Sequence, residues 1–365
     1  MKHKVLFIPI LLILLISCKG PVQEVSIHKY HNAIELGRHL MDSLLQLGQT
    51  PGLDIAISID GEVVWSEGFG FADLEHQLPV IPGVSRFRIG SVSKPLAAAA
   101  VGRLIDMGKM DMDQDIETYV PYWPKKNYHF TVKQVAGHIA GIRHYNGDEF
   151  MMAKHFSTVE EGIDIFKGDP LLFEPGERFS YSSFGWNLVS AAVEGASGKD
   201  FLSFMQKEVF DPLGMTSTCA DKNDSIILHR ASFYELNPGT VMVNARYVDN
   251  SYKWAGGGFL STTLDLLKFG EAHIAAEYLS EETLVTLTTP QVLNNGESTG
   301  YGVGWFADGE GEMYRIHHGG GSIGGITDFV VYPELGIVIA ILSNSSDTTH
   351  GNVLARIVKA FAAEN

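Results

Sequence analysis

Hydrophobic positions near the N-terminus follow first a helical spacing and then a strand spacing. Apolar residues recur at three- and four-residue intervals over 33–47, and Pro51-Gly52 ends that segment. They alternate over 55–59, Asp60-Gly61 supplies a tight turn, and the alternation resumes over 63–65. This pattern predicts a helix followed by a β-hairpin.

The rest of the chain divides into a mixed, mainly helical middle and a strand-rich end. Helical patterns occupy 96–107, 186–194, 201–209 and 353–362, and strand patterns occupy 302–306, 313–317, 327–332 and 337–342. Because strands lie at both ends, we expect an α+β fold with one antiparallel sheet, built from N- and C-terminal segments and flanked by helices. Residues 31–110 and 255–365 would form this sheet domain, and 111–254 a mainly helical inserted domain.

The first thirty residues have the pattern of an export segment. Lys2 and Lys4 precede an unbroken apolar run over 5–16, which is typical of a secretory signal and too short for a settled membrane span. Residues 15–18, Leu-Ile-Ser-Cys, resemble a bacterial lipobox. We therefore expect a signal peptide over 1–17 and a tether over 18–30 that is lipidated at Cys18. The protein would be exported and lipid-anchored at the cell envelope, facing the periplasm or in the outer membrane. The alternative is a signal peptide with an incidental cysteine.

Composition excludes two broad classes of protein. Hydrophobic residues make up 45% of the 365 residues and charged residues 19%, which argues against a mostly disordered chain. The 27 Lys+Arg against 43 Asp+Glu give a net charge of -16, and no basic tract is present to approach phosphates. A nucleic-acid partner is therefore not expected.

Ser91-Val92-Ser93-Lys94 is a candidate nucleophile motif. Ser-x-x-Lys alone is weak, because it recurs at 26–29. Pro95, however, is tolerated only in a first helical turn, so Ser91 must lie at a helix start, where backbone N–H groups favour developing negative charge. Lys94 is one turn further on the same face. Without other motifs, a capping serine followed by a surface lysine is the simpler interpretation.

Two other kinds of site are weaker. Residues 320–324, Gly-Gly-Ser-Ile-Gly, match the nucleophile elbow formally, and Asp328 and His350 follow in the expected order. An elbow needs a helix after its serine, whereas a strand pattern follows here, so Ser322 is rejected as a nucleophile. The 14 histidines form no metal motif, and His317 and His318 would point to opposite faces of a strand. We expect no metal and no cofactor.

Further motifs stand in a familiar order. Tyr181-Ser182-Ser183 follows Phe173-Glu174-Pro175-Gly176, and His318-Gly319-Gly320-Gly321 comes late in the chain. From about residue 50 onward, the chain resembles the serine β-lactamase and penicillin-binding-protein superfamily. The resemblance also includes Ser91–Lys94 and the segments 69–73, 137–145 and 256–262. The chain is most similar to class C β-lactamase-like hydrolases and the mitochondrial serine β-lactamase-like proteins. The resemblance implies the β-lactamase/transpeptidase-like fold.

The resemblance also implies roles for individual residues. Ser91 would be the acylated nucleophile, Lys94 and Tyr181 the proton-handling pair, and the N–H groups of Ser91 and Gly321 the oxyanion hole. A free lysine, with a pKa of about 10.4, is protonated at neutral pH, so Lys94 could be the base only if burial or another cation lowers its pKa. A tyrosinate held by cationic Lys94 is the alternative. His138 is expected to tie down a loop by hydrogen bonding.

Two departures from the family pattern bear on the substrate. The substrate-binding segment His318-Gly319-Gly320 stands where β-lactamases usually carry Lys-Thr-Gly, and Ser183 stands where they usually carry Asn. Histidine is mostly neutral above about pH 6.5, and a serine lacks the amide that holds an acylamino group. We therefore expect a serine acyl hydrolase that acts through a covalent acyl-enzyme on small peptide or ester substrates, with weak or absent activity on β-lactam-like compounds.

Several alternatives remain open at this level. One is a true β-lactamase or a D-Ala-D-Ala-type peptidase. Another is a non-catalytic lipoprotein that binds peptides or cell-wall fragments, and a third is an assembly or scaffolding protein. The sequence does not indicate the oligomeric state.

Overall fold

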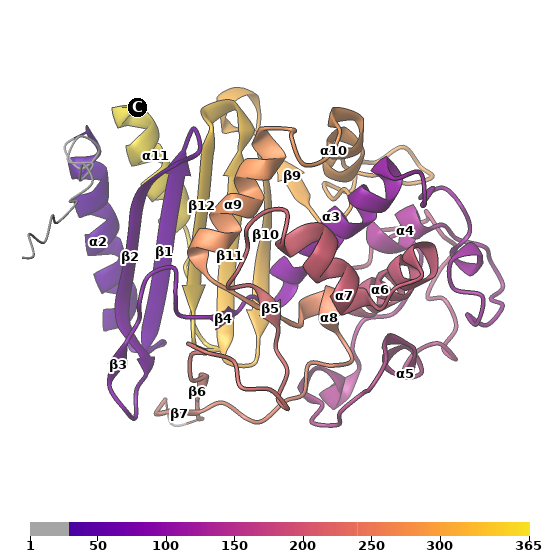
Figure 1. Ribbon diagram of the computed structural model, residues 1–365, viewed down its shortest axis with the longest axis horizontal. Coiled ribbons are helices and arrows are strands. Elements are labelled where there is room, and N and C mark those ends of the chain that lie inside the picture. The colour runs from indigo at the N-terminus through magenta and orange to yellow at the C-terminus, as the bar shows by residue number, and fades with distance from the viewer. Residues whose placement is uncertain (1–28, 239) are drawn as a thin grey trace, which may run out of the picture.

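A seven-stranded antiparallel sheet forms the centre of the computed structural model, which describes residues 29–238 and 240–365 (Figure 1). The strand order is β3 (Leu78–Pro79), β2 (Glu62–Asp73), β1 (Gly52–Ile59), β12 (Ile337–Ser343), β11 (Gly325–Tyr332), β10 (Arg315–Ser322) and β9 (Phe306–Asp308). The N-terminal hairpin thus joins the C-terminal strands through β1 and β12, where Ile57 lies opposite Ile339. The expected fold class is confirmed.

Helices cover both faces of this sheet because its central strands are apolar on both sides. Helices α2 (His31–Gln46) and α11 (Val353–Glu364) pack on one face, against side chains such as Ile57 and Ile339. Helix α9 (Thr263–Ile274) packs on the other face, where Phe269 joins Ala340 in the larger core. All residues of β1 and β12 are buried as a result.

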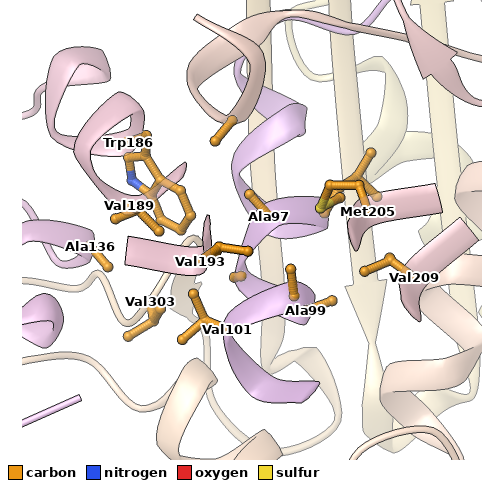
Figure 2. Packing of buried hydrophobic residues seen from close by; sticks show 14 of the residues in the cluster. Ala97, Ala99, Val101, Ala136, Trp186, Val189, Val193, Met205, Val209 and Val303 are labelled. Carbon is orange, nitrogen blue, oxygen red and sulfur yellow. The ribbon is translucent and has the colours of Figure 1, made fainter. Parts of the chain in front are cut away.

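Helix α3 (Ser93–Asp106) runs through the middle of the larger core. Every residue from Ser93 to Gly102 is buried, and the run Ala97–Ala100 lets neighbouring helices approach closely. Figure 2 shows α3 between Val189 and Val193 of α6 (Ser183–Ser197) on one side and Met205 and Val209 on the other. The Ser91–Lys94 motif therefore lies at the start of a helix that is enclosed by the core.

Shorter elements complete the fold. The shorter helices are α4 (Val132–Ala136), α5 (Val159–Ile163), α7 (Phe201–Met205), α8 (Trp254–Gly257) and α10 (Glu281–Thr288). The 3₁₀ turns include η1 (Gly90–Val92), η2 (Ile116–Thr118) and η3 (Gly147–Met151). The small strands are β4 (Phe87–Arg88), β5 (Cys219–Ala220), β6 (Tyr234–Leu236), β7 (Met242–Asn244) and β8 (Phe259–Ser261). Strands β4, β8 and β5 form a second sheet beside η1.

Some expected boundaries were wrong. The strand expected over 302–306 is mostly a turn, because Gly302 donates its N–H to the carbonyl of Trp305 and Gly304 has a φ of 82°. The strand expected over 313–317 starts at Arg315 and continues through the glycines to Ser322. The helix expected over 201–209 is α7 followed by a π-helical turn over Gln206–Phe210.

Other expectations are not tested by this structure. The division into a sheet domain and an inserted domain stays a prediction. The signal peptide over 1–17 and Cys18 lie outside the described residues, as does most of the tether over 18–30. Within the part that the structure describes, no helix has both the length and the apolar character needed to span a bilayer.

Candidate active site

Ser91 lies in the 3₁₀ turn η1, directly before α3. The first N–H groups of such a turn have no acceptor within it, so the Ser91 N–H is available to a ligand. Gly90 makes the turn possible, because its φ is 49° and a Cβ there would lie 2.5 Å from the carbonyl oxygen of Gly321. The serine is half-buried and opens onto the end of β10.

Lys94 is fully buried one turn further along, with its amine beside the Ser91 hydroxyl. Its Nζ lies 3.0 Å from Ser91 Oγ, 3.1 Å from Ser183 Oγ and 2.6 Å from the carbonyl oxygen of Gly256. No carboxylate among the described residues forms an ion pair with it. Burial first, and the nearby Lys253 ammonium second, lower the pKa of Lys94 well below its usual range.

The three contacts of Lys94 Nζ match the hydrogen-bonding capacity of a neutral amine. A neutral lysine has two N–H groups and one lone pair, and the Gly256 carbonyl can only accept a hydrogen bond. The amine can therefore donate to Gly256 and to Ser183 Oγ while its lone pair receives the Ser91 hydroxyl proton. The geometry thus places a proton acceptor on the candidate nucleophile.

Tyr181 lies on the other side of the same hydroxyl. Its ring centroid is 4.8 Å from Lys94 Nζ, and its hydroxyl lies beside those of Ser91 and Ser183. Burial raises the pKa of Tyr181 to about 12, although the two serine hydroxyls oppose the shift. Of the two bases that the sequence left open, the structure therefore favours neutral Lys94, with Tyr181 as a phenol that can pass a proton on.

Two histidines hold the start of α6, and with it Tyr181 and Ser183. The Ser182 N–H donates to His138 Nδ1 at 3.0 Å, and the Ser183 N–H donates to His144 Nδ1 at 3.1 Å. Burial is the main cause that lowers the pKa of His138 well below its usual range and that of His144 to about 4, so both rings remain acceptors. The expected loop contact of His138 is present, whereas the role of His144 was not anticipated.

Gly321 directs its N–H toward the site. Across β10 and β11 it lies opposite Ile326, whose backbone N–H and carbonyl both face Ser343 Oγ of β12 instead. Gly321 and Ile326 are therefore a non-hydrogen-bonded pair, so the backbone groups of Gly321 point to the outer edge of β10. Among the described strands, β9 covers this edge only over 315–317, which leaves Gly321 facing η1.

Gly320 allows β10 to lie directly against η1. A Cβ at this position would be 1.9 Å from the carbonyl oxygen of Ile89 and 3.2 Å from the backbone nitrogen of Ser91. The N–H groups of Ser91 and Gly321 are thereby brought to one small region, as an oxyanion hole requires.

His318 does not offer the cation that a lysine would provide. Its ring is buried, with Nδ1 2.6 Å from the carbonyl oxygen of Gly319 and Nε2 3.2 Å from the Tyr301 hydroxyl. Burial is the main cause that lowers the pKa of His318 to about 3, so the ring is neutral near pH 7. It lies 6.2 Å from the Tyr181 ring and supports that ring rather than reaching out to a ligand, while Gly319 is exposed.

The rejected elbow is not a second catalytic centre. Asp328 and His350 do pair, with 2.9 Å between Oδ2 and Nδ1. Asp328 lies opposite Gly319, so it is on the same face of the sheet as Gly319, whereas Ser322 is on the face of His318. The serine and the pair thus lie on opposite faces. No cluster of three metal-ligating side chains occurs in the described ranges.

Two contributors to the site were not found from the sequence. Lys253 is the second cation near Lys94, and Tyr145 contacts Ser183 through its hydroxyl. Both come from segments of irregular pattern, so no spacing signal marks them. The nearest signal was the segment 256–262 of the family resemblance, which contributes the Gly256 carbonyl.

Comparisons with known proteins agree with this geometry. The family model described as Beta-lactamase matches residues 38–364. The human mitochondrial serine beta-lactamase-like protein LACTB is 30% identical over 440 residues, covering 91% of this chain and 80% of its own.

Two solved structures share the fold. The D-amino acid amidase from Ochrobactrum anthropi SV3 in complex with D-phenylalanine has a TM-score of 0.79 at 21% identity, covering 92% of this chain and 100% of its own. EstCE1, a hydrolase with promiscuous acyltransferase activity, has a TM-score of 0.79 at 19% identity with the same coverages. The family match over most of the chain carries the assignment, and the chain belongs to the beta-lactamase family of serine hydrolases.

Proposed function

We propose that this protein hydrolyses esters and amides of small acyl or peptidyl substrates through an acyl-enzyme on Ser91. The observation that carries the proposal is the 3.0 Å contact between Lys94 Nζ and Ser91 Oγ, at a lysine without a carboxylate partner in the described chain. A lysine meant only to hold the fold would be expected to carry a counter-charge when it is this deeply buried.

The steps follow from the contacts. The Ser91 hydroxyl gives its proton to Lys94 while Oγ bonds to the substrate carbonyl carbon, and the N–H groups of Ser91 and Gly321 stabilise the oxyanion. When the tetrahedral intermediate collapses, the bond to the leaving oxygen or nitrogen breaks. The leaving group takes a proton from the Tyr181 hydroxyl, which is reprotonated by Lys94. Water then cleaves the acyl-enzyme by the reverse route.

The neutral His318 supports the choice of substrate. A β-lactam carries a carboxylate, and the position that usually offers it a lysine holds an uncharged ring with both nitrogens engaged. Two proteins of similar fold are named for amide and acyl-transfer chemistry, a D-amino acid amidase and a hydrolase with acyltransferase activity. Esters and amides without a carboxylate, including those of D-amino acids, are the substrates that this site suits best.

A labelling experiment tests the proposal. A fluorophosphonate probe should label the wild-type protein and leave Ser91→Ala unlabelled, and p-nitrophenyl esters and D-amino acid amides should be turned over faster than a cephalosporin. Absence of labelling in the wild type would point to a binding or scaffolding protein. Faster turnover of the cephalosporin would make it a true β-lactamase.

We also propose that the mature protein is exported and anchored through a lipid on Cys18. The proposal rests on the charged start, the apolar run and the Leu-Ile-Ser-Cys pattern at 15–18. Expression in a bacterial host with labelled palmitate should give a labelled protein in the membrane fraction. Cys18→Ser should be unlabelled, and equal labelling of the two would refute the anchor.

A further inference from the structure

Lys253 is a second fully buried lysine, at the start of the helix that contacts Lys94. It precedes α8 by one residue and Gly256 by three, and only 2% of it is exposed. Its Nζ donates a hydrogen bond to the carbonyl oxygen of Phe150 at 3.2 Å. Aromatic rings surround the same Nζ, at 4.3 Å for Phe150, 5.2 Å for Tyr252 and 5.8 Å for Tyr145. The carbonyl and the ring faces favour a cation there.

One aromatic ring separates this lysine from the reacting groups. Tyr145 presents its ring to Lys253, and its hydroxyl lies beside that of Ser183. Ser183 Oγ in turn lies 3.1 Å from Lys94 Nζ. Because Lys94, Ser183 and Lys253 are all buried, the two amines interact with less screening than charges in water.

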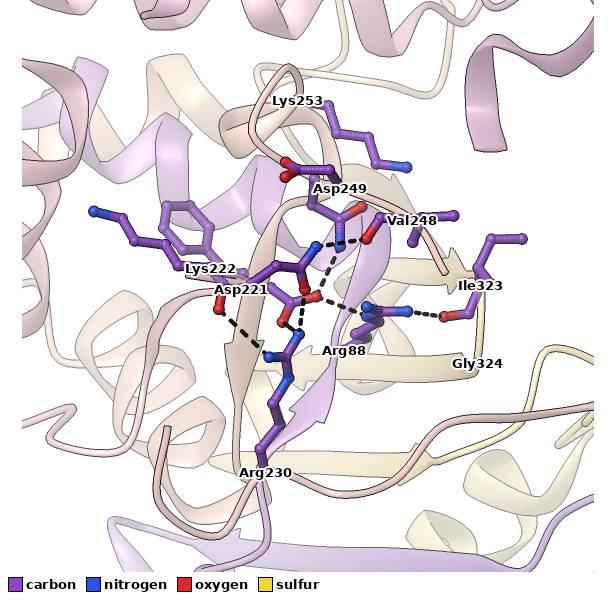
Figure 3. Close-up of polar contacts among 12 residues, drawn as sticks. Arg88, Asp221, Lys222, Arg230, Val248, Asp249, Lys253, Ile323 and Gly324 are labelled. Carbon is purple, nitrogen blue, oxygen red and sulfur yellow. Dashed lines mark hydrogen bonds and ion pairs between the residues drawn. The ribbon is translucent and has the colours of Figure 1, made fainter. Parts of the chain in front are cut away.

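The charges around Lys253 leave its positive charge largely uncompensated. Asp221, the carboxylate that acts on it, is itself paired with Arg88 and Arg230, as Figure 3 shows. Other charged groups of the adjoining segments are also engaged: Glu149 with Arg143, and Asp249 with His155.

The other titratable groups nearby contribute no charge of their own. Burial raises the pKa values of Tyr145 and Tyr252 and lowers that of His144, so all three are neutral near pH 7. Burial and Arg88 lower the pKa of Lys253 to about 7, although Asp221 opposes this. Lys253 therefore carries charge at and below neutral pH without a partner of its own.

We propose that Lys253 is a positioning residue that acts through Lys94: its buried ammonium keeps Lys94 uncharged, so that Lys94 can accept the proton of Ser91. The inference rests on the proposed acyl hydrolase function. The inference assigns Lys253 as the second cation that helps to lower the pKa of Lys94. It also explains why the Lys253 side chain is enclosed by aromatic rings although its amine does not reach Ser91. Two buried like charges disfavour each other, so a proton on Lys253 makes protonation of Lys94 less favourable.

The test compares pH profiles of acylation. The rate of labelling by a fluorophosphonate probe is measured from pH 5 to 10 in wild type, Lys253→Met, Lys253→Arg and the exposed control Lys222→Met. Removing the charge should raise the pKa of Lys94 and move the acidic limb of the Lys253→Met profile about one unit higher, a roughly tenfold loss at pH values below the limb that recovers at pH 10. Lys253→Arg, a permanent cation, should restore the wild-type limb, and Lys222→Met should leave it unchanged.

Three results would overturn the inference. They are an acidic limb of the labelling profile that does not shift in Lys253→Met, a labelling rate that falls equally at every pH, and a wild-type acidic limb near pH 10. A second measurement does not depend on activity. Titration of the lysine ¹³Cε resonances should show Lys94 with a higher pKa in Lys253→Met than in wild type, and equal values refute the coupling. Failure of the wild type to label at all would instead refute the proposed function, while this titration would still decide the coupling.

Discussion

Burial acts in opposite directions on the two titratable side chains beside Ser91. It removes the charge of Lys94 by lowering its pKa, and it keeps Tyr181 protonated by raising its pKa to about 12. Both effects favour the neutral form, so the pair consists of an amine that can accept a proton and a phenol that can donate one. The same low-dielectric surroundings thus keep both Lys94 and Tyr181 in the neutral form that proton transfer requires.

Replacing Lys94 should separate activity from stability. Lys94→Met should lower the fluorophosphonate labelling rate by about 10²–10⁴-fold, because the base is lost. Since a depressed lysine pKa opposes folding below about pH 10, the variant should gain unfolding free energy at pH 6–7. Urea unfolding measures that gain. Unchanged labelling would remove Lys94 from the mechanism, and an unfolded variant would contradict the stability argument.

At the scale of elements, the site is the junction of a strand edge with a 3₁₀ turn. Strand β10 ends beside η1, and Gly320 and Gly90 are the points where the two backbones meet. Because α3 is buried on all sides in its first ten residues, η1 cannot move away to relieve a clash. The distance between the two oxyanion donors therefore depends on the absence of side chains at these positions.

A methyl group at this junction should impair catalysis more than folding. Gly320→Ala places a Cβ 1.9 Å from the Ile89 carbonyl oxygen, so β10 must shift and carry the Gly321 N–H with it. We expect a loss of about 10²–10³ in ester turnover, the usual effect of removing one oxyanion donor. Gly168→Ala, where an added Cβ meets nothing within 4 Å, is the control. Equal turnover in both variants would contradict the assigned oxyanion hole.

The elements that sequence predicted well are those whose signal is local. The alternation over 55–59 and the run 337–342 correspond to β1 and β12, and Ser91 and Lys94 are joined by one helical turn. The strand prediction over 302–306 was wrong because the apolar residues of this segment resemble a strand, whereas Gly304, with its left-handed backbone, makes a turn. Lys253 and Tyr145 could not be found, because only the packing of distant loops brings them near Lys94.

For the whole molecule, one buried acid should make stability depend on pH. Asp54 of β1 is fully buried, and its Oδ2 accepts hydrogen bonds from the Gly83 N–H at 3.2 Å and the Thr263 hydroxyl at 2.9 Å. Burial nevertheless raises the pKa of Asp54 to about 7. Between its unfolded pKa of about 4 and this value the folded chain binds the extra proton, so stability falls as the pH rises through that window.

Asp54→Asn should remove this dependence. Unfolding free energy measured in urea should drop by on the order of 3 kcal/mol more in wild type than in the variant between pH 5 and pH 8. At pH 8 the variant should be the more stable of the two. Equal slopes for the two proteins would show that Asp54 is already ionised in the folded state.

The pairing of β1 with β12 also sets a condition on how this protein is made. Strand β12, at the middle of the sheet, leaves the ribosome long after its partner β1. A nascent chain cannot complete this sheet until β12 has been synthesised, since the closing contacts join residues as distant in sequence as Leu53 and Ser343. A product that stops before β12 would leave β1 and β11 as two bare apolar edges, and it would aggregate rather than retain partial activity.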